Sequence, residues 1–200
     1  MADAPPTGSE VQHEDWGGRE LRGETFAGVT FVEVDLSEVV TEGSVFTGCT
    51  FRGVRFNVSE HRSSAFLNCV FTRCSFFDST FTGCKLVGSR FDSCSLDLLK
   101  VDGGDWSFVG LAGANLTGVS FIDVRMREAD LSGVRAPNAT LRGLDLSGAL
   151  LAKADLSGCD LRGSDLSAIE PGTVLLRDAV ITYEQAVTLA LAAGLDVRPE

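Results

Sequence analysis

The sequence of 200 residues has few of the side chains on which most enzyme chemistry depends. Its only histidines are His13 and His61, and no serine or cysteine has a general base at a matching spacing. The glycine pairs Gly17-Gly18 and Gly103-Gly104 lack the following Lys-Ser/Thr of a phosphate-binding loop. These absences predict a protein that is not an enzyme, with no catalytic residue, no cofactor-binding residue and no metal ligand.

Long apolar runs are also missing. No apolar stretch approaches the roughly 18 residues of a membrane-spanning helix, so we predict no membrane contact. The first residues lack the positive and apolar regions of a signal peptide. They are rich in proline, glycine and acid, which predicts a disordered tail over residues 1–15 and a cytoplasmic location.

Basic residues are scarce: 17 Lys and Arg stand against 28 Asp and Glu, for a net charge of −11. This balance disfavours direct binding of nucleic acid, which requires cationic contacts to phosphate. The charge is uneven, at −7 over residues 1–60, +3 over residues 61–90 and −3 over residues 91–110. On charge alone, the acids could simply form a soluble surface.

What the sequence does contain is a strict repeat of five. From Leu21 to Ile181, 25 of the 33 positions at every fifth residue are Leu or Phe, and no insertion breaks the count. The residue two before each is small, and glycine is common two after it, as in the unit Ala154-Asp155-Leu156-Ser157-Gly158. A period of five fits neither a helix nor a strand. It is typical of a chain that turns a corner every five residues.

This unit resembles the repeat of the pentapeptide-repeat protein family. The resemblance implies an all-β fold, a right-handed quadrilateral β-helix of about eight coils, over residues 16–181. Four pentapeptides would complete each coil, with the Leu or Phe and the small residue pointing inward. Such a solenoid needs covered ends, because each coil contacts only its neighbours.

The six cysteines all occupy the small-residue position of the repeat, two before a central large apolar residue. No CxxC pair or supporting histidine cluster accompanies them. We therefore predict reduced thiols packed in the core rather than disulfides or a zinc site. They are Cys49, Cys69, Cys74, Cys84, Cys94 and Cys159.

Eight central positions are not Leu or Phe, and three of these carry a polar residue or proline. His61 lies one coil after Thr41 on the same face. It is either a local defect that presents a partner site or a polar core residue satisfied by its neighbours. Pro171 replaces a central Leu or Phe, and we expect it to bulge the last coil.

Residues 182–200 predict a short C-terminal α-helix and tail. Thr182 and Gln185 form a capping box, and Gly194 is placed to end the helix. The helix is apolar nearly all round, so it needs cover on more than one side. We expect one side to cap the last coil and the other to form a homodimer. The predicted interface residues are Ala186, Val187, Leu189, Ala190, Leu191 and Ala193.

A narrower resemblance follows from three features: the segment Glu60–Phe66, the uninterrupted coils after it, and the terminal helix. Together they are similar to the mycobacterial fluoroquinolone-resistance (MfpA-type) family. This resemblance implies a dimeric DNA mimic that binds DNA gyrase, a type II topoisomerase, at its DNA site. It would inhibit the enzyme or protect it from quinolones or other gyrase poisons.

The carboxylates that could replace DNA phosphates lie at outward positions of the repeat. Three of them share one column, which Arg125 interrupts, and three lie on neighbouring edges. These gyrase-contact candidates are Asp105, Asp145, Asp165, Asp130, Asp155 and Asp160. A structural or scaffolding solenoid that binds another protein is the alternative. The residues leave open whether the role is self-immunity, acquired drug resistance or regulation of supercoiling.

Overall fold

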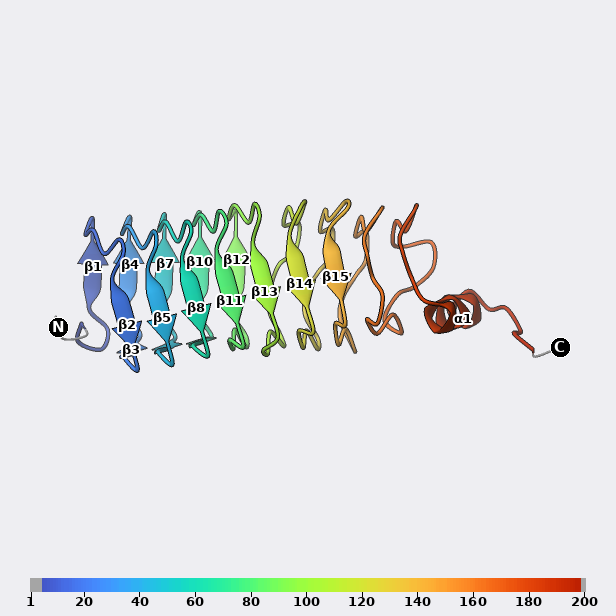
Figure 1. Cartoon of the computed structure of the whole chain (residues 1–200), viewed down its shortest axis with the longest axis horizontal. Coiled ribbons are helices and arrows are strands. Elements are labelled where there is room, and N and C mark those ends of the chain that lie inside the picture. The colour runs from blue at the N-terminus through green and yellow to red at the C-terminus, as the bar shows by residue number, and fades with distance from the viewer. Residues whose placement is uncertain (1–4, 199–200) are drawn as a thin grey trace.

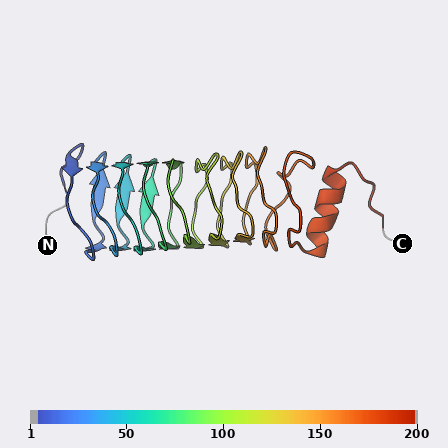
Figure 2. The same ribbon diagram turned by 90° about the horizontal axis from the view of Figure 1, so that it is seen from above.

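The computed structural model describes residues 5–198 and shows a straight rod with the two ends of the chain at opposite ends (Figures 1 and 2). Short parallel strands stack along the rod, and each pairs with the strand 20 residues further on, as in Glu10↔Thr30 and Thr30↔Thr50. Because the sequence unit is five residues, a 20-residue step gives a coil with four faces. The predicted β-solenoid is confirmed.

Three faces carry strands. Face 1 holds β1 (Glu10–Gln12), β4 (Thr30–Val32), β7 (Thr50–Arg52), β10 (Val70–Thr72) and β12 (Arg90–Asp92). Face 3 holds β2 (Glu20–Arg22), β5 (Val40–Glu42), β8 (Glu60–Arg62), β11 (Thr80–Thr82), β13 (Lys100–Asp102), β14 (Ser120–Ile122) and β15 (Thr140–Arg142). Face 4 holds β3 (Thr25–Ala27), β6 (Val45–Thr47) and β9 (Ala65–Leu67).

Face 2 and the later coils are joined by single bridges at the same spacing. Face 2 begins with Asp15↔Asp35, and face 3 continues past β15 through Thr140↔Asp160 and Asp160↔Val180. In the N-terminal coils the central residue is flanked by Thr and Val, which favour strands. In the later coils it is flanked by Asp, Ser and Gly, which favour turns. The coil persists in both halves, but the later half has fewer strands.

The core consists of the inward positions that the repeat predicts. The N-terminal half stacks phenylalanines along the inner sides of faces 1, 2 and 4, with ring centroids 4.5 Å apart for Phe26 and Phe46 and 4.6 Å for Phe46 and Phe66. The C-terminal half is built mainly from leucines, which cannot stack in this way. They leave an apolar cavity of about 20 Å³ whose lining includes Leu131, Leu146 and Leu161.

The solenoid begins earlier than residue 16. Val11 and Trp16 are buried in central positions, and β1 pairs with β4. The prediction of a disordered tail over residues 1–15 is therefore wrong for the coil that contains β1, while residues 1–4 lie outside the described residues. Val11 and Trp16 continue the five-residue register, but neither is a Leu or Phe, so a count based on those two residues misses them.

The C-terminal helix α1 (Tyr183–Ala192) lies across the end of the rod (Figure 2). Its capping box forms as predicted, and Gly194 follows the helix with a φ of 81°. The Gln185 amide is buried and donates to the carbonyls of Leu161 and Ser164, both at 2.7 Å. The helix thus satisfies backbone groups of the coil that it covers.

Pro171 interrupts the last coil as expected. Its side chain is exposed, and a turn closed by the bond from Thr173 N–H to Glu170 C=O surrounds it. Lys153 N–H then bonds to Thr173 C=O, one residue later than the register of the other coils. The ladder resumes at Leu156, which bonds to Leu175.

Candidate functional site

The six candidate carboxylates do not gather on one surface. The bridges place Asp105 and Asp145 on face 4, and Asp165 continues the same ladder through its bond to Leu144. The other three occupy the three remaining faces: Asp130 on face 1, Asp155 on face 2 and Asp160 on face 3. A partner that contacts one face therefore meets at most three of the six.

All six share a local role that the five-residue period alone did not predict. One carboxylate oxygen of each accepts a hydrogen bond from the backbone N–H two residues later, at 2.9–3.2 Å. This bond closes the corner of the coil as an Asx turn. Asn115 does the same for Thr117, so the corner requires the oxygen and not the charge. The repeated pattern Asp/Asn-x-Ser/Thr is the sequence signal for this role.

Three of the six are also paired with arginine. Arg125 contacts Asp105 at 3.0 Å, Arg127 contacts Asp145 at 2.5 Å, and Arg162 contacts Asp160 at 2.7 Å. The hydrogen bond from Arg162 holds the pKa of Asp160 at about 2. Within residues 5–198, no Lys, Arg or His lies within ion-pair distance of Asp130, Asp155 or Asp165. These three are the carboxylates most available to a partner.

Arg52, Arg73 and Arg90 make face 1 of the middle coils basic. Arg52 and Arg73 line an open recess of about 630 Å³ together with Arg55. Arg55 pairs with Asp35 at 2.6 Å, whereas Arg52, Arg73 and Arg90 have no ion pair with any carboxylate of residues 5–198. The middle of face 1 therefore differs from a uniformly acidic surface, in line with the net +3 of residues 61–90.

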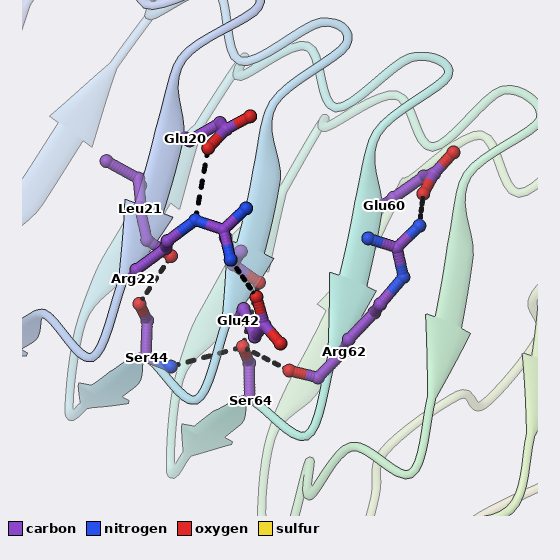
Figure 3. Close-up of polar contacts among 9 residues, drawn as sticks. Glu20, Leu21, Arg22, Glu42, Ser44, Glu60, Arg62 and Ser64 are labelled. Carbon is purple, nitrogen blue, oxygen red and sulfur yellow. Dashed lines mark hydrogen bonds and ion pairs between the residues drawn. The ribbon is translucent and has the colours of Figure 1, made fainter.

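Face 3 of the first coils carries charges that neutralise one another (Figure 3). Arg22 contacts Glu20 at 3.0 Å and also reaches Glu42, and Arg62 pairs with Glu60. All these groups are about half exposed, so each pair contributes little to stability. They lower the density of free carboxylates at this end of the rod.

His61 is a satisfied core residue and not an exposed defect. It is 1 % exposed, with Thr41 Oγ1 2.9 Å from Nδ1 and Ser59 Oγ 2.9 Å from Nε2. Thr41 also donates to Ser64, so the ring nitrogens and the surrounding hydroxyl groups form one hydrogen-bonded cluster. Burial lowers the pKa of His61 to about 3. The polar side chains around His61 therefore bond to one another inside the core.

The cysteines are free thiols, as predicted. Five are buried and Cys94 is half-buried. Burial raises the pKa of Cys84 and of Cys159 to about 11, so these thiols are poor nucleophiles. Residues 5–198 contain no group of three or more His, Cys, Asp or Glu that could hold a metal ion. In the same range no helix is long and apolar enough to cross a bilayer.

The outer side of α1 exposes apolar side chains. Tyr183 is 83 % exposed and Leu191 is 55 % exposed. Of the predicted interface residues, Ala186 and Ala193 are exposed, and Val187 and Ala190 are half-buried. Leu189 packs against the core on the same side as Gln185, so it belongs to the cap and not to the free surface.

The repeat has a match among known protein families. Residues 108–135 and 138–167 match the family model for pentapeptide repeats, in eight copies. The matched segments have the same 20-residue ladder as the coils before them. Over these residues the chain consists of pentapeptide repeats.

Two solved pentapeptide-repeat structures share its fold. HetL, involved in heterocyst differentiation regulation in the cyanobacterium Nostoc sp. strain PCC 7120, is 22 % identical with a TM-score of 0.63, over 85 % of this chain and 88 % of HetL. A trypsin-treated form of QnrB1, a plasmid-mediated fluoroquinolone resistance protein, is 24 % identical with a TM-score of 0.52, over 96 % of this chain and 98 % of QnrB1. No curated protein matches the sequence. At these identities the likeness establishes the fold.

Proposed function

We propose that this pentapeptide-repeat protein is a non-enzymatic DNA mimic. It binds DNA gyrase at the enzyme's DNA site, and it inhibits the enzyme or protects it from quinolones or other gyrase poisons. The observation that carries the proposal is the net charge of −11 on a rod without inserted loops. The structural likeness to QnrB1 supports it, because that protein confers fluoroquinolone resistance.

The mechanism is competition between the rod and duplex DNA. Carboxylates placed where phosphates would lie meet the Lys and Arg of the enzyme's groove, so binding is steered by charge and weakened by salt. Asp165 on face 4 and Asp155 on face 2 are unpaired and lie in the last coils. A dimer through α1 would bring these carboxylates close to its two-fold axis.

A scaffolding solenoid that binds another protein remains the second candidate. The distribution of the acids favours it: the six candidates are spread over four faces, and three are neutralised by arginine. The regulatory role of HetL, which has the same fold, agrees with such a function.

A supercoiling assay separates the two candidates. We expect the protein to inhibit supercoiling by gyrase from the same organism and to reduce quinolone-induced cleavage. The double variant Asp155→Asn/Asp165→Asn removes two charges but keeps the turns, as Asn115 does at its own corner. We expect it to inhibit several-fold less well, with the loss greatest at low salt.

The matched control is Asp15→Asn/Glu38→Gln, which removes two charges in the first coils. We expect near-native inhibition, because these residues lie far from α1. Equal losses in both double variants would assign the effect to net charge alone. No inhibition by the intact protein at large molar excess would leave the scaffold function.

A further inference from the structure

One edge of the rod exposes apolar residues in an unfavourable backbone conformation. The residue at nearly every corner of the coil has a positive φ, and glycine or a polar residue occupies most of these corners. Among residues 5–198 the apolar exceptions are Val58, Leu98 and Phe108, with φ of 58°, 59° and 60°. A bulky residue is strained there, and a β-branched one especially so.

Burial does not compensate for this strain. Val58 is 49 % exposed and Leu98 is 48 % exposed, so both side chains leave much of their apolar surface in water. Glycine occupies the equivalent corner at Gly18, Gly118 and Gly158. Strained residues that gain little from packing are typical of positions kept for binding.

Val58 and Leu98 belong to one patch on the edge between faces 2 and 3. They lie two coils apart, and the exposed Phe77 lies in the coil between them. Val58 N–H bonds to Phe77 C=O at 2.8 Å, and Asp78 N–H bonds to Asp97 C=O at 3.0 Å, so the backbones of successive coils are joined here. Asp78, next to Phe77 in sequence, occupies the corner between Val58 and Leu98. We call Val58, Phe77 and Leu98 the apolar edge.

The rim of the apolar edge is acidic. Glu38 precedes Val58 by one coil, and Asp97 follows Phe77 by one coil. The structure gives neither an ion pair with a Lys, Arg or His of residues 5–198. Lys100 is bound to Asp78 at 2.7 Å. The patch thus combines apolar side chains with free negative charge, and it complements a cationic apolar partner.

The spacing of the three apolar residues along the rod indicates the shape of the partner. Coils repeat every ~4.8 Å, so Val58, Phe77 and Leu98 lie at about 0, 5 and 10 Å along the rod. An α-helix places its apolar residues i, i+3 or i+4, and i+7 at nearly the same intervals, since it rises about 1.5 Å per residue. We propose that the apolar edge binds a cationic amphipathic helix of a partner protein, laid along the rod. This inference does not depend on the gyrase site.

The probe is a synthetic 15-residue helical peptide with leucine at i, i+3, i+4 and i+7 and lysine elsewhere. We expect it to shift the NMR methyl signals of Val58 and Leu98. We expect a peptide with glutamate in place of lysine to leave them unchanged. The variant Val58→Gly/Phe77→Ser/Leu98→Gly keeps every charge of the protein and should bind the lysine peptide at least about tenfold more weakly.

Phe108→Gly is the matched control, because Phe108 has the same strained conformation on the edge between faces 4 and 1. We expect it to raise the Tm by a few degrees, an effect also expected of the changes at Val58 and Leu98, and to leave peptide binding unchanged. Undiminished binding to the triple variant would overturn the proposal, since charge alone would then explain it. Absence of shifts at the two methyl groups would overturn it as well.

Discussion

At the scale of single residues, His61 shows how a polar group is tolerated inside an apolar rod. Both ring nitrogens have hydroxyl partners, and the ring stacks on Phe81 with centroids 4.4 Å apart. Among residues 5–198, no carboxylate lies within ion-pair distance of His61 to stabilise the charged ring. The protein therefore holds this histidine neutral at the expense of its acid stability.

The pH dependence follows from the pKa of His61, which falls from 6.5 in the unfolded chain to about 3 in the fold. Between these values the unfolded chain binds more protons, so stability is lost as the pH falls below about 6.5. At pH 4 the loss is on the order of 3 kcal/mol. Urea unfolding at pH 7, 5.5 and 4 measures it.

The double variant Thr41→Leu/His61→Phe restores the Leu and Phe pattern and supplies the comparison. We expect the free energy of unfolding of this variant to change less between pH 6.5 and 4 than that of the native protein. The remaining acid sensitivity would come from carboxylates such as Asp35 and Asp160, whose pKa of about 2 confines their effect to lower pH. If the free energy of unfolding of the native protein changed as little with pH as that of the variant, His61 would not be the cause of the acid sensitivity.

The sequence predicted the inward residues well, because a fixed period of five determines which side chains face the core. It did not predict what the outward acids do. The column containing Asp105 and Asp145 is readable from spacing, but the bonds to Ser107 and Arg127 depend on turn geometry and on arginines from neighbouring positions. The sequence therefore shows where the negative charges lie, but it does not show which carboxylates are free to bind a partner.

At the scale of elements, α1 covers the end of the solenoid through specific hydrogen bonds as well as through apolar packing. The sequence predicted α1 and its capping box from Thr182 and Gln185. It could not show that Gln185 also donates to Leu161 and Ser164, since that depends on how the helix lies across the coil. One amide thus joins the helix start to the end of the solenoid.

Gln185→Glu tests this junction with a nearly isosteric change. The carboxylate cannot donate to the two carbonyls, so we expect a loss of roughly 2–4 kcal/mol in the free energy of unfolding. Faster amide hydrogen exchange should be confined to α1 and the last coil. Glu184→Gln, the exposed neighbour, serves as the control and is expected to change stability by only a few tenths of a kcal/mol. If both variants lost the same stability, Gln185 would not be the residue that joins the helix to the last coil.

At the scale of the whole molecule, the outer side of α1 predicts the homodimer. We expect Leu191→Asp to give monomers with an intact solenoid, because Leu191 is exposed and would carry a charge into the interface. Leu189→Asp is expected to weaken the cap instead, since Leu189 packs on the core. Light scattering measures the mass and circular dichroism the fold.

Leu150→Asp makes the same change at another exposed leucine, on face 1 away from the helix, and should remain dimeric. If the intact protein is a monomer at micromolar concentration, the two-rod arrangement fails. The alignment of Asp155 and Asp165 about a two-fold axis would fail with it.

The 20-residue register, which holds along the rod except at the turn around Pro171, determines both the face on which a residue lies and its height along the rod. Insertion of five residues between two coils would turn everything beyond that point by about a quarter turn, and Asp155 and Asp165 would each move to the next face. Insertion of 20 residues would only advance the same surface by ~4.8 Å. Length changes during evolution are thus of two kinds: multiples of 20 adjust reach, and other multiples of five redirect the surface. Where one partner contacts both halves of the rod, only the first kind preserves the fit.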